Sequence, residues 1–237
     1  MSRTIMVINP NTTTAMTDAV VAAARAAAAP GTTLVAGTPR EGVSSVESHF
    51  DEVWGAVGVL DRVRAGELSG VDGYVIACFG DTGVPAAREL ARGPVVGMTE
   101  AALFTAALVA PRFTVVTLPR RTREMSDRVL RETGLAHRCT VRAIDVPVAD
   151  IAEGSLHELD AVAAEAASAI EQDAAEAVVL GCAGLADLVA PLQRRLGVPV
   201  IEGVSAAVTM VDGLLSQRVT TSRASTYAVP ERQEPTS

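Results

Sequence analysis

Two cysteines occupy similar positions in this sequence and are of a residue type that can transfer protons. Cys78 follows the apolar run at 75–77, and Cys182 follows the run at 178–181. Each run is typical of a buried strand, and a glycine lies two residues after each cysteine. If both strands end at one cleft, a thiolate on one side can remove a proton from a carbon while a thiol on the other side returns one. The pair therefore predicts proton transfer at a carbon centre.

The segments that carry the cysteines belong to a loose internal repeat. The two cysteines are separated by 104 positions, and Pro94 and Pro199 by 105. Residues 5–10 also resemble residues 114–119 at an offset of 109. We interpret the near-constant offset as a duplicated α/β half-unit related by a pseudo-twofold axis, with the strand ends of both halves meeting at one cleft.

The elements that must position the cysteines alternate between apolar, β-branched runs and alanine-rich helical patterns. This alternation predicts an α/β fold with parallel sheets. The expected strands are 4–9, 33–36, 73–78, 94–97, 113–117, 140–144, 176–181 and 198–201. The expected helices are 13–29, 50–65, 83–92, 99–109, 122–132, 156–172, 185–195 and 204–217. Residues after about 220 are rich in Ser, Thr, Pro and Glu and indicate a surface extension or frayed tail.

Composition excludes several classes of function. The 237 residues carry a net charge of −8, so no basic stripe is available for nucleic acid. No apolar run approaches the roughly 20 residues that a membrane helix needs, and no leader sequence is evident. We therefore expect a cytoplasmic protein with a small-molecule substrate, no nucleic-acid partner and no membrane partner. With three widely spaced cysteines, free thiols are expected.

The chain contains no lysine, because all 20 basic residues are arginine. Pyridoxal-phosphate enzymes and Walker-type phosphate loops both require a lysine, so both classes are excluded. The three scattered histidines, His49, His137 and His157, give no metal-binding motif. A Gly-x-Ser-x-Gly hydrolase elbow is also missing.

The surroundings of the cysteines suggest roles for their neighbours. Both cysteines precede a glycine-containing turn into an expected helix, whose N–H groups should lower the thiol pKa. Cys139 enters an ordinary strand and is interpreted as structural. Asn11 either contacts a ligand or caps a helix, and Asp81 either orients a group near Cys78 or caps the following helix. The charged residues Glu47, His49, Asp51 and Glu52 are interpreted as helix-start charges.

Several motifs resemble a known family. They are INPNT at 8–12, VSSVE at 43–47 followed by FDE at 50–52, ACFGD at 77–81 and LGCAG at 180–184. Together they resemble the hydantoin racemase branch of the aspartate/glutamate racemase superfamily, from residue 3 to about 217. ACFGD together with GVSAAV at 203–208 is most similar to the allantoin-specific members of that branch. The sequence departs from the family at 118–121, where LPRR replaces a frequent second threonine.

The resemblance implies a cofactor-independent racemase of two similar lobes with the active site between them. One lobe would comprise 1–97 plus 208–237, and the other 98–207. It also implies a hydantoin-type substrate, with allantoin favoured, no cofactor, no metal, and a homo-oligomer. Cys78 and Cys182 would be the catalytic acid/base pair. The expected substrate contacts are Asn11, Val46, Phe79, Gly80, Thr117, Leu118, Ala183 and Gly184.

Other functions stay open at this point. A decarboxylase of aryl malonate-type substrates would have the same architecture, but it needs only one cysteine to protonate an enolate. A non-catalytic binding protein with inert thiols is a further alternative. An amino-acid racemase is disfavoured, because the residues after both cysteines lack the Asn-Thr and Thr-His companions of that branch.

Overall fold

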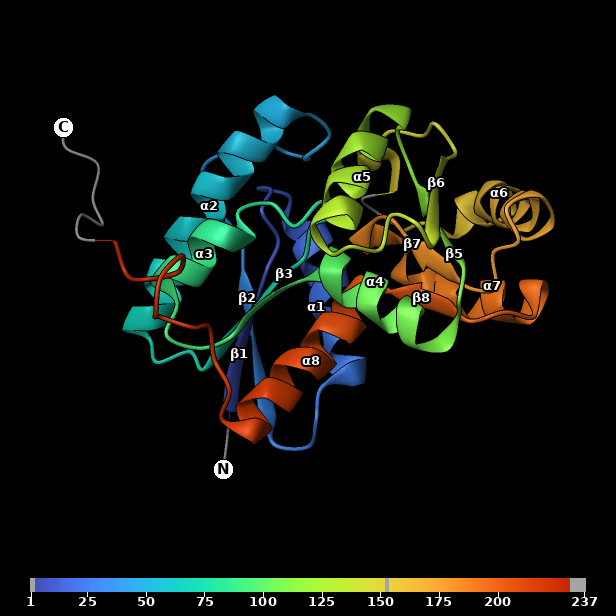
Figure 1. Ribbon diagram of the computed structural model, residues 1–237. Helices are drawn as coiled ribbons and strands as arrows, with labels where there is room; N and C mark the ends of the chain where they lie inside the picture. The colour runs from blue at the N-terminus through green and yellow to red at the C-terminus, as the bar shows by residue number, and fades with distance from the viewer. Residues whose placement is uncertain (1–2, 152–153, 231–237) are drawn as a thin grey trace.

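The protein is built on two parallel sheets, each of four strands within the described residues. A computed structural model describes residues 3–151 and 154–230. The first sheet has the strand order β2-β1-β3-β4 and the second β6-β5-β7-β8, and Figure 1 shows them side by side with helices packed around them. The strands are β1 (Arg3–Ile8), β2 (Thr32–Gly37), β3 (Gly73–Ile76), β4 (Val95–Gly97), β5 (Phe113–Thr117), β6 (Cys139–Ala143), β7 (Val178–Leu180) and β8 (Val200–Glu202).

Helices connect the strands as parallel sheets require. The α-helices are α1 (Thr14–Ala27), α2 (His49–Leu68), α3 (Val84–Leu90), α4 (Met98–Val109), α5 (Arg123–Glu132), α6 (Leu159–Gln172), α7 (Val189–Leu196) and α8 (Gly203–Gln217). Short 3₁₀ helices are η1 (Arg120–Thr122), η2 (Val148–Ile151), η3 (Leu156–Glu158) and η4 (Ala183–Leu188). No described helix is long and apolar enough to cross a membrane.

The two sheets repeat the same topology, which confirms the predicted two-lobed α/β fold. In each lobe the first strand in sequence pairs with the second and third, and the third pairs with the fourth. Ile8 pairs with Ile76 in the first sheet, and Val116 pairs with Leu180 in the second. The carboxyl ends of β3 and β7 therefore occupy matching places in the two lobes.

Two expected helices differ from prediction. Residues 185–195 were expected to form one helix, but they divide into the end of η4 and most of α7. Pro191 has no N–H to donate to the carbonyl of Asp187, so a continuous α-helix cannot run through this region. Residues 156–158 likewise form the 3₁₀ turn η3 before α6 begins.

The C-terminal helix α8 returns to the first sheet. It lies against β3 and β4 and contacts α1 and α4. Val204, Val208 and Val211 of α8 are fully buried with Ile5 and Val75 of that sheet in one hydrophobic cluster. Burial of several such side chains, at about 1.5–3 kcal/mol each, fixes α8 on the first lobe.

The described part of the tail, 219–230, forms neither helix nor strand but is not frayed. The Arg223 guanidinium donates to the carbonyl oxygens of Arg88, Glu89 and Ala91 at the end of α3. The charge of Arg88 lies 5.9 Å from the centre of the Tyr227 ring. A cation at a helix C-terminus is favourable, so these contacts hold the tail on the first lobe. Residues 231–237 of the predicted tail lie outside the described residues.

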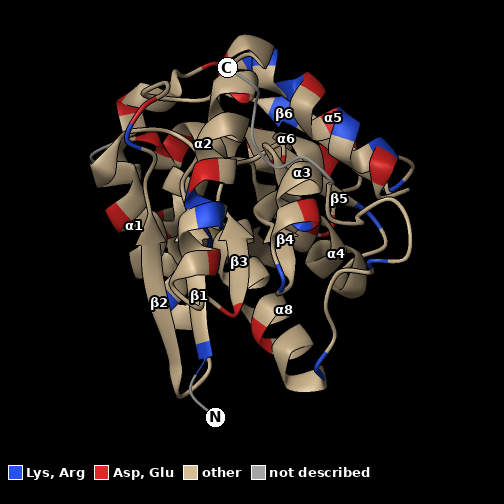
Figure 2. Ribbon diagram, turned by 90° about the vertical axis from the view of Figure 1, so that its left-hand side faces the viewer, with Lys and Arg blue, Asp and Glu red and all other residues tan. Residues whose placement is uncertain are grey.

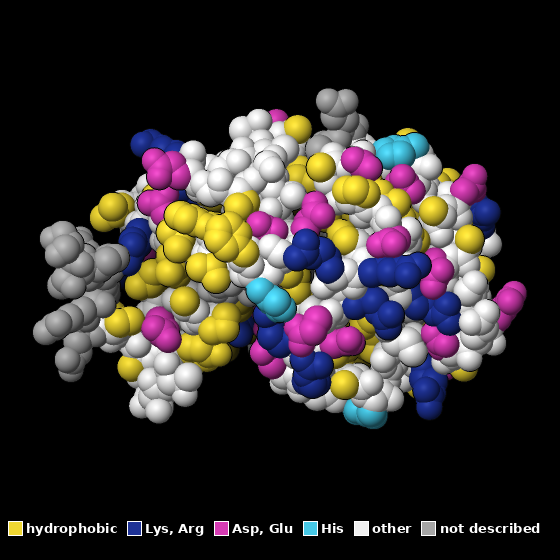
Figure 3. Space-filling model, turned by 90° about the horizontal axis from the view of Figure 1, so that it is seen from above, with side chains coloured by type: hydrophobic (Ala, Val, Ile, Leu, Met, Phe, Trp, Pro, Cys, Tyr) yellow, Lys and Arg dark blue, Asp and Glu magenta, His cyan; other side chains and the backbone are white. Residues whose placement is uncertain are grey.

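Helix α2 buries a face that contains several glycines and exposes a stripe of large apolar side chains. Its large apolar side chains point to solvent, with Phe50 70% exposed, followed by Val53, Trp54 and Val57 at helical spacing. Figure 3 shows hydrophobic side chains gathered on this half of the molecule. The inward face combines three glycines with two buried valines, namely Gly55, Gly58, Gly66, Val59 and Val63. A Cβ at Gly66 would lie 2.7 Å from the Tyr74 ring, so glycine permits the close approach of α2 to the sheet.

Candidate active site

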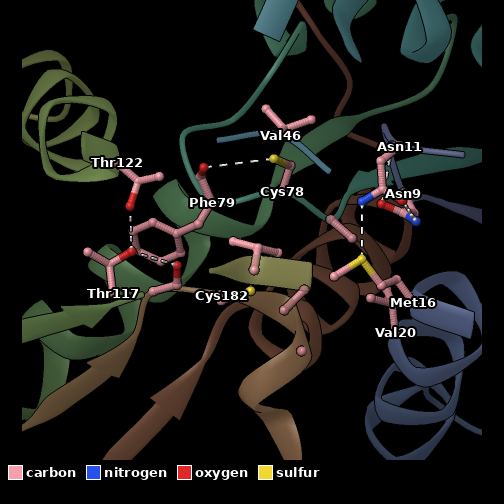
Figure 4. Close-up of a pocket in the computed structure, with 15 residues that line it drawn as sticks. Asn9, Asn11, Met16, Val20, Val46, Cys78, Phe79, Thr117, Thr122 and Cys182 are labelled. Atoms are coloured by element: carbon pink, nitrogen blue, oxygen red, sulfur yellow. Dashed lines mark hydrogen bonds between the residues drawn. The ribbon is translucent and has the colours of Figure 1, made fainter. Parts of the chain in front are cut away.

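A cavity of about 60 Å³ lies between the lobes at the carboxyl ends of β1, β3, β5 and β7. Ligands bind at this end of the strands in open α/β sheets. Figure 4 shows the side chains that surround it. Its lining residues are Asn9, Asn11, Met16, Val20, Val46, Ala77, Cys78, Phe79, Thr117, Thr122, Val148, Gly181, Cys182, Ala183 and Gly184.

Both predicted thiols reach this cavity, one from each lobe. Cys78 comes two residues after β3, and Cys182 comes two residues after β7. The Cys78 Sγ lies 3.8 Å from the Phe79 carbonyl oxygen and accepts a hydrogen bond from the Thr82 hydroxyl at 3.4 Å. Residues about one hundred positions apart are thereby brought to opposite sides of one space.

The third cysteine lies elsewhere. Cys139 begins β6 at the edge of the second sheet and packs against the cluster around Phe113 and Val115. Its Sγ is 3.3 Å from the Thr140 carbonyl oxygen. It lines none of the cavity, which agrees with a structural role.

The ionisation of both cavity thiols is disfavoured, contrary to the expectation of a lowered pKa. Burial raises the pKa of Cys78 to about 12, against a hydrogen bond from Thr82 that lowers it. Burial likewise raises the pKa of Cys182 to about 11, against the nearby backbone N–H of Gly184, which lowers it. The expected helix-start effect is weak at Cys78 because α3 begins only at Val84. At both thiols, loss of water outweighs the local donors.

The polar wall of the first lobe is an asparagine network. The Asn9 side-chain nitrogen donates to Asn11 Oδ1 at 2.8 Å and to the Thr17 hydroxyl at 3.1 Å. Asn11 Oδ1 also accepts from the Thr13 backbone N–H at 2.9 Å, so this oxygen holds the turn before α1. Within the described residues, the Asn11 side-chain nitrogen donates to a weak acceptor, Met16 Sδ, at 3.4 Å. The Asn11 oxygen therefore supports the turn that precedes α1, whose N-cap is Thr13, while Asn11 also lines the cavity. A ligand contact by Asn11 stays a prediction.

The polar wall of the second lobe is a threonine pair. The hydroxyls of Thr117 and Thr122 are 3.0 Å apart, and Thr117 also lies 3.3 Å from the Gly181 carbonyl. Thr117 is the last residue of β5, and Asn9 directly follows β1. The two residues therefore lie at corresponding strand ends of the two lobes. Sequence reasoning did not select Asn9 or Thr122, although the position of Asn9 directly after β1 was a usable signal.

The expected substrate contacts divide into two groups. Six line the cavity, namely Asn11, Val46, Phe79, Thr117, Ala183 and Gly184. Gly80 and Leu118 do not. Leu118 is fully buried in the core of the second lobe, because it follows Thr117 and so points to the opposite side. Gly80 faces a separate, larger cleft between α2 and α5.

The residues interpreted as helix-start charges have different tasks. Asp51 and Ser48 do form the start of α2, with Ser48 accepting from the Asp51 N–H. Glu47 instead reaches the second lobe, where it accepts from the Val148 N–H at 3.2 Å. His49 is exposed and its Nδ1 lies 3.0 Å from Glu52 Oε2. Sequence periodicity could not show that Glu47 bridges the lobes.

Glu52 joins the lobes through Arg128 of α5, a helix rich in charges of both signs (Figure 2). Arg128 donates to the two Glu52 oxygens at 3.1 and 2.6 Å and to the Gly80 carbonyl at 2.8 Å. Burial raises the pKa of Glu52, but the hydrogen bonds from Arg128 and His49 outweigh burial and hold it below the ordinary value. This bidentate pair anchors the loop that carries Cys78.

Asp81 caps a helix, but not the one that follows it. Its carboxylate accepts from the N–H groups of Thr99 at 2.8 Å and Glu100 at 2.9 Å, at the start of α4. Burial and the charge of Glu100 raise its pKa to about 7. Thr99 in turn accepts from the Gly80 N–H at 2.7 Å. The loop after Cys78 is therefore held at both Gly80 and Asp81.

The described residues contain no group of three His, Cys, Asp or Glu side chains placed to hold a metal ion. The chemistry that this arrangement offers is proton transfer in a small, largely apolar cavity. Two thiols on opposite walls can act on opposite faces of one bound atom.

Comparison with known proteins agrees with this geometry. The family model for Asp/Glu/hydantoin racemases matches residues 5–211. The hydantoin racemase of Pseudomonas sp. (strain NS671) is 40% identical, over 97% of this chain and 93% of that protein. Allantoin racemase from Klebsiella pneumoniae is 48% identical with a TM-score of 0.96, covering 100% of this chain and 97% of the other.

A second solved structure and a more distant one place the fold. Allantoin racemase from Pseudomonas fluorescens is 38% identical with a TM-score of 0.94, covering 99% of this chain and 100% of the other. Arylmalonate decarboxylase is 21% identical with a TM-score of 0.62, covering 90% of this chain and 92% of the other. The likeness to the decarboxylase shows a shared fold alone.

Proposed function

Because this chain belongs to the Asp/Glu/hydantoin racemase family, we propose that it racemises allantoin, or failing that another 5-substituted hydantoin, through Cys78 and Cys182. Hydantoin racemase and allantoin racemase relatives support a racemase activity for the chain. The observation that carries the two-thiol mechanism is the convergence of Cys78 and Cys182 on one cavity from different lobes.

The reaction follows from the position of the acidic hydrogen. The C5–H bond of a hydantoin ring is next to a carbonyl, so removal of the proton leaves the electron pair delocalised as an enolate. In one direction, the Cys78 thiolate takes the C5 proton and the Cys182 thiol gives its proton to the other face of C5. The products are the opposite enantiomer, a Cys78 thiol and a Cys182 thiolate. The reverse direction exchanges the two roles.

The cavity lining supplies groups suited to hold the ring. The side-chain N–H of Asn11 donates to the Met16 sulfur, which is a weak acceptor. A carbonyl oxygen of the hydantoin ring would be a stronger acceptor for this N–H. Thr117 and Thr122 offer hydroxyls on the opposite lobe. Val46 from the first lobe and Val148 from the second close the cavity with apolar surface. Exclusion of water strengthens each electrostatic contact with the developing enolate oxygen.

A racemisation assay tests the proposal. Single enantiomers of allantoin and of 5-substituted hydantoins are followed by circular dichroism with and without the protein. We expect loss of optical activity well above the spontaneous rate. If none of these compounds racemises faster with the protein, the proposed activity is wrong.

Cysteine variants test the mechanism. Cys78→Ser and Cys182→Ser should each abolish racemisation, and each should still exchange the C5 hydrogen for deuterium from one enantiomer only. Cys139→Ser is the matched control and should racemise normally, because Cys139 lies outside the cavity. Normal racemisation by either of the first two variants would contradict the two-thiol mechanism.

A decarboxylase needs a single proton donor, so the second cavity thiol counts against that alternative. Carbon dioxide release from an arylmalonate distinguishes the two reactions. We expect none.

A further inference from the structure

The two cavity thiols have different hydrogen-bond surroundings. Cys78 accepts a hydrogen bond from a side chain, the Thr82 hydroxyl, at 3.4 Å. Cys182 stands at the start of η4, and its side chain makes no capping hydrogen bond to that turn. The two halves of the duplicated site are therefore chemically unequal.

We propose that Thr82 is a positioning residue that stabilises the thiolate form of Cys78 and so sets how the negative charge is shared between the two thiols. The inference deepens the proposed racemisation and rests on it. It adds a residue that is outside the cavity lining and acts on substrate only through Cys78.

The surroundings of Thr82 hold its hydroxyl on the sulfur. Thr82 is 2% exposed, and Cys78 Sγ is the hydrogen-bond partner of its hydroxyl among the described residues. Its methyl group packs toward α2, where a Cβ at Gly55 would come within 3.1 Å of it. The small residue on α2 therefore leaves room for the threonine methyl. A buried hydroxyl without another acceptor strongly favours this one geometry.

The charged neighbours of Cys78 act in the opposite sense. The Cys182 thiolate, Glu52 from α2 and Asp81 from the same loop all raise the pKa of Cys78, as does burial itself. The hydrogen bond from Thr82 lowers it. A hydrogen bond to an ionised acceptor is stronger than one to a neutral group, so the hydroxyl favours the thiolate over the thiol.

The consequence for catalysis concerns the resting enzyme. The form with a Cys78 thiolate accepts one enantiomer, and the form with a Cys182 thiolate accepts the other. Loss of the Thr82 hydroxyl should shift the charge toward Cys182. Because the two enantiomers have equal free energies, kcat/KM must remain the same in both directions for any variant. The imbalance must therefore appear as unequal changes in KM for the two enantiomers, offset by kcat.

Thiol labelling tests the proposal without depending on racemase activity. The unsubstituted protein, Thr82→Val and Thr82→Ser are treated with iodoacetamide across pH 7–10, and labelling of each cysteine is followed by peptide mass spectrometry. Thr82→Val keeps the shape but removes the hydroxyl, so Cys78 labelling should slow by about tenfold while Cys182 labelling does not slow. Thr82→Ser keeps the hydroxyl and should restore Cys78 labelling. Thr114→Val, a buried change in β5 remote from both thiols, should label as the unsubstituted protein does.

The outcomes separate this inference from the proposed function. If Cys78 labels equally fast with and without the hydroxyl, or if Thr82→Ser behaves like Thr82→Val, Thr82 does not stabilise the thiolate. If the labelling pattern holds but the unsubstituted protein racemises no hydantoin, the proposed function fails and the hydrogen bond stands. If Thr82→Val is misfolded by circular dichroism, the Thr82→Ser variant decides, since it must retain normal Cys78 labelling. Equal KM changes for both enantiomers in Thr82→Val would also overturn the proposal.

Discussion

We predict that Arg128→Met weakens the connection between the two lobes and lowers the stability of the fold. Arg128 lies on α5 in the second lobe, while its partners Glu52 and Gly80 belong to the first. Methionine keeps much of the aliphatic stem but removes all three donated hydrogen bonds. The variant leaves a carboxylate without its cation and frees the loop that follows Cys78.

The exposure of the pair sets the size of the effect. Exposed ion pairs contribute about 0–1 kcal/mol. Removing one partner of a buried pair costs about 3–5 kcal/mol. The side chains of Arg128 and Glu52 are 33% and 12% exposed, so this pair lies between those limits, at about 2 kcal/mol. For a chain of this length that corresponds to a fall in Tm of about 4–8 °C.

The pH dependence of this stabilisation has a definite sign. Hydrogen bonds from Arg128 and His49 hold the pKa of Glu52 below its ordinary value of 4.5 in the folded protein, despite the opposing effect of burial. A carboxylate with a lowered folded pKa stabilises the fold fully above its unfolded pKa, and the stabilisation is lost as the pH falls through the folded value. The difference between the unsubstituted protein and Arg128→Met should therefore be constant above about pH 5.5 and shrink toward pH 3.

Thermal unfolding followed by circular dichroism measures the effect. A double-mutant cycle with Glu52→Gln isolates the pair from other losses. Arg131→Met is the matched control, because Arg131 lies on the same helix and pairs with Glu124 where both side chains are more than half exposed. At about 0–1 kcal/mol for an exposed pair, it should change Tm by about 0–4 °C, less than Arg128→Met does. The reasoning is refuted if Arg128→Met and Arg131→Met melt together, or if the cycle gives no coupling between Arg128 and Glu52.

Three further predictions follow from the same structure. Gly66→Ala should destabilise the protein by about 1–3 kcal/mol in urea unfolding, because its Cβ would meet the Tyr74 ring. Gly213→Ala in α8 meets open space and should instead leave stability equal or higher by about 0.5–1 kcal/mol; equal losses for both variants would contradict the packing argument. Burial raises the pKa of Cys78 to about 12 and that of Cys182 to about 11, so kcat/KM for racemisation should rise about tenfold per pH unit from pH 6 to 9. A flat profile would show that the thiolate forms more easily than the burial of the thiols indicates. If the predicted homo-oligomer buries the apolar stripe of α2 against a second copy, Trp54→Glu should lower the mass measured by light scattering to that of one chain, and an unchanged oligomer would place the interface elsewhere.

The fold was predictable because its signals are local. Strands of parallel sheets are covered on both faces, so they appear as continuous apolar runs, and every expected strand is present within two or three residues at its ends. The boundary of α7 was less accessible, since it depends on Pro191 and a 3₁₀ turn rather than on apolar spacing. The orientation of α2 could not be predicted at all. Periodicity shows which residues share a face of a helix but not that the glycine face is the one turned inward.

The site was predictable where residue type and strand ends suffice. Cys78, Cys182, Asn11 and Thr117 each lie at or just after the end of a strand, which is where such folds gather ligands. Val46, which lies away from any strand end, was expected only through the family resemblance. Val148 was not expected, because nothing near it in the sequence shows that it faces the first lobe.

The sequence by itself therefore determined two things. It determined the reactive groups, which are two matched thiols in a chain without a lysine to hold a cofactor. It also determined the duplicated α/β fold that carries these thiols. The tertiary structure decided how those thiols behave. Their pKa depends on how much water the two lobes exclude, which is a sum over atoms from the whole cavity wall. Local reasoning from the following helix start predicted a lowered pKa, and burial reversed it. The hydrogen bond from the Thr82 hydroxyl to Cys78 and the ion pair of Arg128 with Glu52 likewise form only because folding brings these side chains together.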